Sequence, residues 1–137
     1  MSTLKHIVCL IDDDKVYQYT AKMILETTGL TNDIKTFFNG KEAIDFLSDP
    51  DNQQVDIIPD VIFLDINMPI MNGWNFLQSF DEIRKNLPKK VIIYVVSSSV
   101  DESDIHRSKN FESVTDYIIK PINREKYRQL LSILPQV

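Results

Sequence analysis

The chain has 137 residues, of which 43% are hydrophobic and 26% are charged, and its formal net charge is −5. This length fits a single domain over residues 1–137 that buries a substantial core. The acidic balance gives no electrostatic footprint for binding nucleic acid or an anionic membrane surface, and no apolar segment approaches the length of a membrane span.

The first apolar run, at residues 6–11, predicts a buried β-strand. Its apolar part, residues 7–11, is too short for the core of a signal peptide and is followed at once by three aspartates. The sequence contains one cysteine, Cys9, which therefore cannot form an internal disulfide. We expect Cys9 to fill the core of a protein that works in the reducing cytoplasm.

Helical patterns follow the first two strands. In the first, at residues 15–28, five residues share one helical face and Gly29 provides a stop; they are Val16, Tyr19, Thr20, Met23 and Ile24. The second helix opens at Asn39, a capping residue with the acid Glu42 three positions later. Its inward-facing residues are expected to be Ala43, Phe46 and Leu47.

Three further helices are predicted in the second half of the chain. The third is closed by Pro88 and carries the apolar residues Phe76, Leu77, Phe80, Ile83 and Leu87. The fourth, at about residues 101–110, has Ser99 and Glu102 as a capping box, but Ile105 is almost its only apolar residue. We therefore expect it to be loosely held and to face solvent. The fifth carries Tyr127, Leu130, Leu131 and Leu134.

The helical patterns alternate with four further β-branched or aromatic runs, which predict strands at residues 33–38, 61–64, 91–96 and 116–119. A polar loop at residues 49–59 lacks the glycine and the terminal glutamate of a calcium loop, and we interpret it as a solvated connection. Strict alternation with right-handed crossovers predicts an α/β fold. The expected architecture is flavodoxin-like and three-layered (α/β/α), with a five-stranded parallel sheet of order 2-1-3-4-5 and five helices.

Four of the predicted strands end in polar residues of distinct types. They are Asp12-Asp13-Asp14 after the first strand, Asp65 after the third, Ser97-Ser98-Ser99 after the fourth, and Lys120-Pro121 after the fifth. In the order 2-1-3-4-5 the carboxyl ends of these strands lie side by side, at the edge where open α/β sheets bind ligands. The sequence therefore predicts one polar site built from four loops.

The residue types at this edge indicate phosphoryl chemistry. Three carboxylates in one crevice repel each other unless a cation intervenes, and a hard divalent ion such as Mg²⁺ (or Mn²⁺) prefers such oxygen ligands. An aspartate such as Asp65 can accept a phosphoryl group, because the metal would screen the charge of the incoming anion. Lys120 adds a positive charge for a phosphoryl oxygen, and Ser97 adds a hydroxyl donor. Asp14 is expected only to cap the first helix.

In this ordered set of motifs the chain resembles the receiver domain of two-component response regulators, the family that contains the chemotaxis receivers. The motifs are Ile7-Val-Cys-Leu-Ile-Asp12-Asp13, Asn39-Gly-Lys-Glu-Ala, Phe63-Leu-Asp65-Ile-Asn-Met-Pro69-Ile-Met-Asn-Gly73, and Tyr117-Ile-Ile-Lys120-Pro121. Three departures are visible: Ser97 replaces the commoner Thr, Ser98 stands where Ala or Gly is usual, and residues 111–115 lack a frequent Gly-Ala pair. Serine lacks the methyl group that restricts rotamers, so the switch is expected to be less sharply two-state.

The resemblance implies a role for each site residue. Asp65 would be the phosphoacceptor and a metal ligand, Asp13 a direct ligand of the metal and Asp12 a ligand through water. The backbone carbonyl of Asn67 would complete the metal shell. Ser97 and Lys120 would contact the phosphoryl group. The resemblance also implies that Tyr117 changes rotamer when Ser97 moves, although simple packing is the alternative for Tyr117, and that the bond before Pro121 is cis.

The expected function is that of a stand-alone, cytoplasmic receiver, because the chain ends after the fifth helix and leaves no room for an effector domain. A histidine kinase or histidine phosphotransfer protein would phosphorylate Asp65, and an output protein would bind the face formed by helix 4, strand 5 and helix 5. The domain would catalyse only its own phosphorylation and dephosphorylation. It would be a monomer or a weak, phosphorylation-dependent dimer.

Two alternatives remain open at this point. An aspartate-dependent phosphohydrolase of the haloacid dehalogenase type also uses a strand-end Asp, magnesium and a Lys, but it needs a second Asp where this chain has Asn67. A receiver-like scaffold that is never phosphorylated would not need the complete set of acidic and basic residues. For Trp74, which opens the third helix, packing against the site loop and exposure to a partner are both compatible with the sequence.

Overall fold

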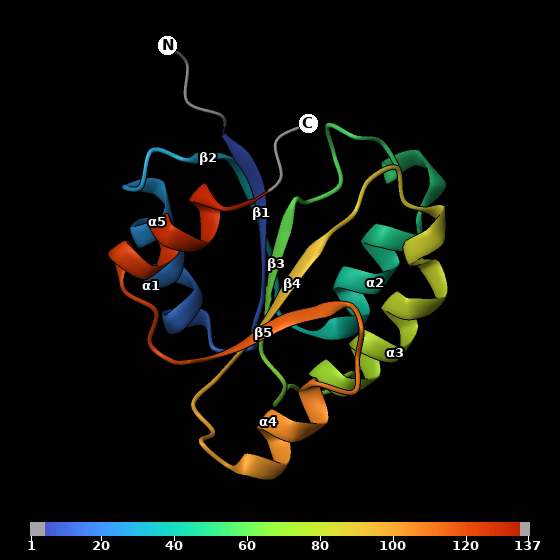
Figure 1. Ribbon diagram of the computed structural model, residues 1–137. Coiled ribbons are helices and arrows are strands. Elements are labelled where there is room, and N and C mark those ends of the chain that lie inside the picture. Colours follow the sequence, from blue (N-terminus) through green and yellow to red (C-terminus); the bar gives the residue numbers. More distant parts are fainter. Residues whose placement is uncertain (1–4, 135–137) are drawn as a thin grey trace.

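The computed structural model describes residues 5–134 and confirms the predicted fold class (Figure 1). Five parallel strands form one sheet in the order β2-β1-β3-β4-β5. The strands are β1 (His6–Ile11), β2 (Thr31–Phe37), β3 (Val61–Leu64), β4 (Ile92–Ser97) and β5 (Val114–Ile119). The helices are α1 (Lys15–Glu26), α2 (Gly40–Ser48), α3 (Gly73–Ile83), α4 (Glu102–Ser108) and α5 (Arg124–Ser132), with short 3₁₀ turns at Pro50–Asn52 and Arg84–Asn86.

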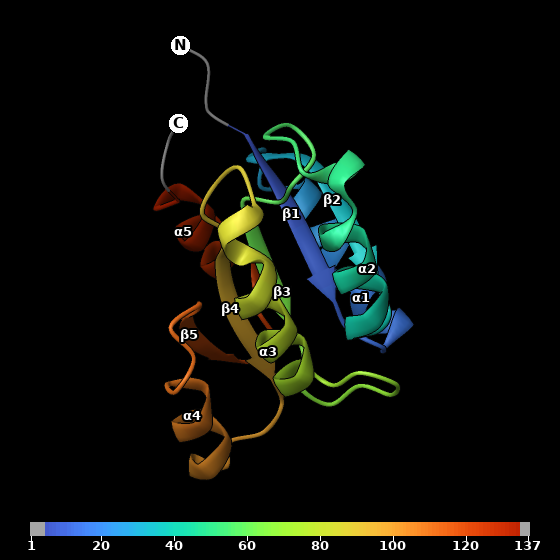
Figure 2. The same ribbon diagram turned by 90° about the vertical axis from the view of Figure 1, so that its right-hand side faces the viewer.

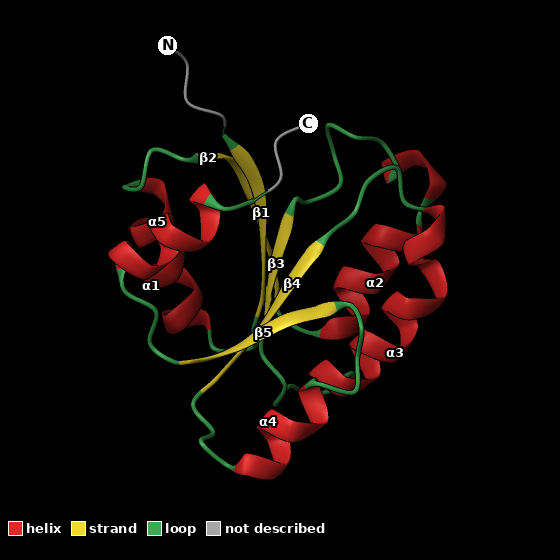
Figure 3. Ribbon diagram, viewed as in Figure 1, coloured by secondary structure: helices red, strands yellow, loops and turns green. Residues whose placement is uncertain are grey.

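The helices form a layer on each face of the sheet (Figures 1 and 3). Side chains alternate along β1: Val8 and Leu10 pack with α1 and α5, while Cys9 and Ile11 pack with α2 and α3. Figure 2 looks onto the second layer, with α2 and α3 in front of the strands and α4 beyond the β5 side. Parallel strands place their carboxyl ends at one edge, so the four polar loops meet there. Within residues 5–134, no helix has the length and apolar character needed to cross a bilayer.

Several local predictions are confirmed. Asp14 caps α1 by accepting the Tyr17 amide hydrogen at 3.0 Å, and Asn39 caps α2 in the same way from Glu42. The glutamate in turn accepts from the Phe38 amide at 2.9 Å. Cys9 is buried, and burial raises the pKa of its thiol.

The prediction for the packing face of α1 is wrong. Val16, Tyr19 and Met23 are 77, 68 and 52% exposed, and the buried residues of this helix are Gln18, Ala21 and Leu25. A polar residue lies on the inner face because the backbone satisfies it: the Gln18 amide donates to the carbonyls of Leu10, Asp12 and Phe37. Apolar periodicity alone therefore selected the wrong face.

The edge strands and the start of α4 also differ from the prediction. β2 begins at Thr31 and β5 at Val114, earlier than predicted, because edge strands keep polar residues on their solvent side that resemble loop sequence. Asp101 caps α4 by accepting from the Ser103 amide at 2.9 Å, so the predicted capping box of Ser99 and Glu102 is wrong. The Ser99 hydroxyl instead donates to the Asp104 carboxylate.

Candidate functional site

The three predicted acids converge at the carboxyl edge of the sheet. Asp12 and Asp13 follow β1, Asp65 follows β3, and one oxygen from each of the three carboxylates lies within 4.8 Å of the others. Asp12 and Asp65 are buried, with 4 and 7% exposure, whereas Asp13 is exposed and closes the cluster toward solvent. Such a group of hard oxygen ligands fits Mg²⁺, which commonly keeps several waters in its shell.

The backbone holds the two acidic loops together. The Asp65 amide donates to the Ile11 carbonyl at 2.9 Å, which joins the end of β3 to the end of β1. Gln18 reaches from α1 to the Asp12 carbonyl at 2.9 Å and to the Phe37 carbonyl at 2.6 Å, which joins β1 to β2. The acids are therefore placed by hydrogen bonds between separate strands, and their convergence does not depend on flexible loops.

Asp65 lies in an environment that disfavours its negative charge. Burial is the largest cause and the charge of Asp12 the next, and together they raise the pKa of Asp65 from 3.8 to about 6. The Lys120 charge and a hydrogen bond from the Asn67 backbone oppose this rise. A metal cation beside Asp65 would offset the repulsion between Asp65 and Asp12 and would favour the ionised carboxylate. The clustering of the two acids therefore favours metal binding.

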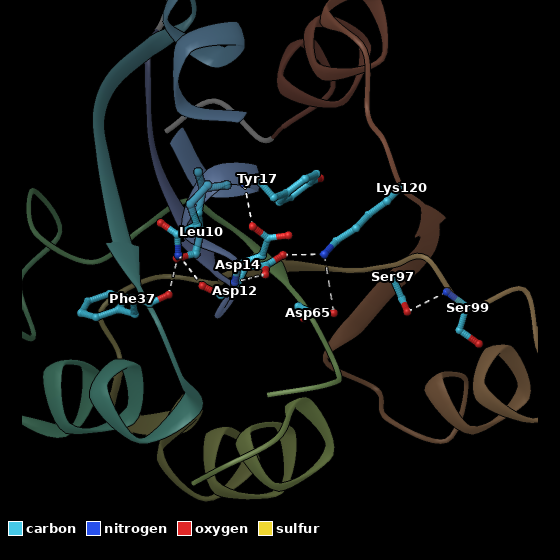
Figure 4. A network of polar contacts seen from close by, with 10 residues as sticks. Leu10, Asp12, Asp14, Tyr17, Phe37, Asp65, Ser97, Ser99 and Lys120 are labelled. Carbon is cyan, nitrogen blue, oxygen red and sulfur yellow. Dashed lines mark hydrogen bonds and ion pairs between the residues drawn. The ribbon is translucent and has the colours of Figure 1, made fainter. Parts of the chain in front are cut away.

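Lys120 brings a positive charge to the acids from the end of β5. Its Nζ lies 2.7 Å from Asp12 Oδ2 and 3.9 Å from Asp65 Oδ1 (Figure 4). Burial acts to lower the pKa of Lys120, but its hydrogen bond to Asp12 and the charges of both acids outweigh burial and raise it. The Lys120 amide donates to the Ser97 carbonyl at 2.9 Å, and the peptide bond between Lys120 and Pro121 is cis, as the resemblance implied.

The predicted switch residues lie along one short path from the site. Ser97 is fully buried at the end of β4, and its hydroxyl accepts from the Ser99 amide at 3.0 Å. The Ser99 carbonyl in turn accepts the phenol hydrogen of Tyr117, from β5, at 2.9 Å. A displacement of the loop after Ser97 would therefore change the acceptor that holds Tyr117.

The two residues predicted next to the acidic cluster have different surroundings. Asn67 is exposed in the loop after β3, on the same loop as Asp65. Trp74 is packed: it is buried, stacks on Phe111 at 6.0 Å between ring centroids, and has the Arg107 guanidinium 4.6 Å from its ring. These contacts join the start of α3 to α4 and to the segment before β5.

Sequence reasoning missed two residues of this site, Gln18 and Tyr17. The signal for Gln18 was present, because it lies one helical turn before Ala21 and two turns before Leu25, on the face opposite to the chosen one. Tyr17 left no such signal. Its ring lies 4.2 Å from the Lys120 ammonium, a contact between residues more than 100 positions apart in the sequence that only the fold creates.

The fold and the site together define a flavodoxin-like α/β domain with three clustered acids and a lysine at the carboxyl edge of its sheet. The sequence matches the family of response regulator receiver domains over residues 8–132. The chain therefore belongs to this family, whose members are signalling domains of two-component systems. This membership favours the receiver over the phosphohydrolase of the haloacid dehalogenase type.

Relatives and solved structures agree with this assignment. The chain is 34% identical over 122 residues to the sensor histidine kinase CheAY of Helicobacter pylori, covering 88% of this chain and 14% of that protein. It is 33% identical over 124 residues to the probable C4-dicarboxylate response regulator DctR of Bacillus subtilis, covering 90% of this chain and 50% of that protein. A two-component response regulator from Cytophaga hutchinsonii has a similar structure, with a TM-score of 0.81, 29% identity and coverage of 92 and 94% of the two chains. This chain thus spans half or less of the length of these two curated relatives.

Proposed function

We propose that Asp65 accepts a phosphoryl group from a histidine kinase or a histidine phosphotransfer protein, and that the phosphorylated domain then binds an output protein in the cytoplasm. One observation carries this proposal. Three carboxylates lie within 4.8 Å of one another, and the Lys120 ammonium lies 2.7 Å from Asp12 and 3.9 Å from Asp65. An anionic nucleophile next to a partly buried cation is an arrangement that favours transfer of a phosphoryl group.

The proposed transfer is a substitution at phosphorus. An ionised Asp65 oxygen forms the new bond to phosphorus, and the bond from phosphorus to the donor breaks, with its electron pair leaving on the donor atom. Lys120 faces both acids and supplies a positive charge to a phosphoryl oxygen. Ser97, fully buried at the neighbouring strand end, supplies a hydroxyl as donor to another oxygen.

The same residues fit a divalent ion. Asp12, Asp13 and Asp65 would hold Mg²⁺ (or Mn²⁺), together with the backbone carbonyl of Asn67, with Asp12 acting through a water. When bound, the ion neutralises negative charge on the acids and on the phosphoryl oxygens. Lys120 would then be released from Asp12, because the two cations compete for the same carboxylate.

The switch would run from Ser97 to the output surface. When the Ser97 hydroxyl turns to a phosphoryl oxygen, it loses its bond from the Ser99 amide, and the loop carrying the Tyr117 acceptor can move. Tyr117 and the short, half-exposed α4 would respond, which changes the face formed by α4, β5 and α5. We expect this face to bind the output protein, and the domain to be a monomer or a weak dimer when phosphorylated.

Incubation with acetyl phosphate and Mg²⁺ followed by intact-mass measurement tests the proposal. Wild type is expected to gain one phosphoryl group, and Asp65→Asn none, because the amide is not a nucleophile at neutral pH. Asp56→Asn is the matched control, since Asp56 is an exposed aspartate outside the site, and it should behave as wild type. A wild type that gains no phosphate, or an Asp65→Asn variant that gains as much, would show that Asp65 is not the acceptor.

A further inference from the structure

Tyr17 contacts Lys120 through its aromatic face. The Lys120 Nζ lies 4.2 Å from the centroid of the Tyr17 ring, well inside the range of a cation–π interaction. Figure 4 shows the Lys120 side chain reaching toward Asp12 and Asp65, with Tyr17 beside it. The ammonium therefore has three partners, two carboxylates and one ring.

The Tyr17 ring is held in place from several sides. Its backbone amide donates to the cap Asp14 at 3.0 Å, which fixes the first turn of α1. Its side chain shares a hydrogen bond with that of Tyr127 of α5. The Tyr127 ring is in turn edge-on to Phe63, with ring centroids 5.2 Å apart and planes at 88°. The cavity between these rings and Asp65 measures only about 10 Å³, which is at the lower limit for one water. The ring, which is partly buried, therefore has little room to move on its inner side.

The ring differs from the other two partners of Lys120 in one respect. Asp12 and Asp65 belong to the acidic cluster, so a metal ion in the cluster weakens their hold on the ammonium. An aromatic face is not a ligand for a hard divalent ion and keeps its attraction for the ammonium. The contact with Tyr17 therefore persists when the contacts with the acids are weakened.

We propose that Tyr17 is a positioning residue for Lys120: its ring keeps the ammonium beside Asp65 when the carboxylates bind metal, so that Lys120 is in place for the incoming phosphoryl group. This role rests on the proposed function of Asp65 and Lys120. It adds a residue of α1 to the site and has a cost, because an ammonium held in the cluster repels the divalent ion.

The proposal predicts that Tyr17→Leu binds Mg²⁺ more tightly than wild type but is phosphorylated more slowly. Without the ring, Lys120 leaves the cluster more easily, so the dissociation constant for Mg²⁺ should fall by about threefold to tenfold, the range expected for one cation–π contact. The initial rate of phosphorylation by acetyl phosphate, at saturating Mg²⁺, should fall by about the same factor. Damage to packing alone would instead weaken Mg²⁺ binding and slow phosphorylation together.

The test combines NMR, Mg²⁺ titration by calorimetry, and phosphorylation followed by intact mass. In the phosphate-free protein, the Lys120 methylene protons next to Nζ should be shifted upfield by the ring in wild type and in Tyr17→Phe, and this shift should be lost in Tyr17→Leu. Tyr17→Phe should have the same Mg²⁺ affinity and the same rate of phosphorylation as wild type. Tyr19→Leu, which removes an exposed ring from the same helix, is the matched control and should match wild type in all three measurements.

Four results would overturn the proposal: an unshifted Lys120 in wild type, weaker Mg²⁺ binding in Tyr17→Leu, phosphorylation of Tyr17→Leu at the wild-type rate, or a Tyr17→Phe variant that behaves like Tyr17→Leu. The NMR and Mg²⁺ measurements need no phosphate. They therefore fail or succeed separately from the proposed function, which fails if wild type takes up no phosphoryl group.

Discussion

Asp65→Asn is expected to stabilise the metal-free protein at neutral pH by about 1–3 kcal/mol, because the folded chain holds this carboxylate where its charge is disfavoured. Burial, and then the charge of Asp12, raise its pKa from 3.8 to about 6. An acid with a higher pKa in the folded chain than in the unfolded chain takes up protons on folding. Its ionisation therefore destabilises the fold increasingly as the pH rises from about 4 to about 6, and fully above that range. Asparagine carries no charge and avoids this loss.

Urea unfolding of both proteins between pH 4 and pH 8 checks this prediction. The difference in the free energy of unfolding should be greatest above pH 6 and should shrink as the pH falls toward 4, where Asp65 is protonated in the folded chain and partly protonated in the unfolded chain. Saturating Mg²⁺ should narrow the difference, because the ion binds the folded wild type. Asp56→Asn, at an exposed site, should change the free energy by less than about 0.5 kcal/mol. A destabilised Asp65→Asn at neutral pH would contradict the electrostatic account of the site.

Gly73→Ala is expected to destabilise the fold by about 2–4 kcal/mol, since a methyl group at this position overpacks the backbone of the site. An added Cβ would lie 2.6 Å from Ile66 Cα and 2.7 Å from the Asp65 carbonyl oxygen. Both neighbours are main-chain atoms, so relief requires α3 or the β3 loop to shift. The Gly73 amide also donates to the Ile66 carbonyl at 3.0 Å, and that bond would lengthen.

Thermal and urea unfolding measure the loss, and a Mg²⁺ titration measures its effect on the site. We expect weaker Mg²⁺ binding in Gly73→Ala, because the shift displaces Asp65. Gln78→Ala is the control: Gln78 is exposed on the same helix, and the change should alter stability by less than about 0.5 kcal/mol. Wild-type stability in Gly73→Ala would mean that α3 does not pack against the Asp65 loop as described.

The sequence predicted the site because, in a parallel sheet, the residues that follow neighbouring strands lie close together at one edge. β1 and β3 are buried on both faces, so their continuous apolar runs were easy to locate, and the polar residue after each run had to emerge at the carboxyl edge. The sequence alone was therefore enough to assign Asp12, Asp65 and Lys120 to one site, before any distance between them was known. The same argument placed Ser97 at this edge.

Other features depend on tertiary contacts that leave no trace in local patterns. The inner face of α1 was assigned wrongly because Gln18, a polar residue, is buried where three backbone carbonyls satisfy it, while Val16 and Tyr19 remain exposed. The contact between Tyr17 and Lys120 joins the first helix to the last strand. A pattern that counts hydrophobic residues records neither the hydrogen-bond partners of an amide nor the position of a ring relative to a distant ammonium.

The most direct test of the central claim is to identify the phosphorylated side chain. Sodium borohydride reduces an aspartyl phosphate to homoserine, so the protein treated with acetyl phosphate and Mg²⁺ can be reduced, digested and mapped by peptide mass spectrometry. We predict homoserine in place of Asp65, with Asp12 and Asp13 unmodified and no conversion when the Mg²⁺ is chelated. Homoserine in place of either of the other two acids, or its absence from a protein that carries a phosphoryl group, would contradict the assignment of Asp65 as the phosphoacceptor.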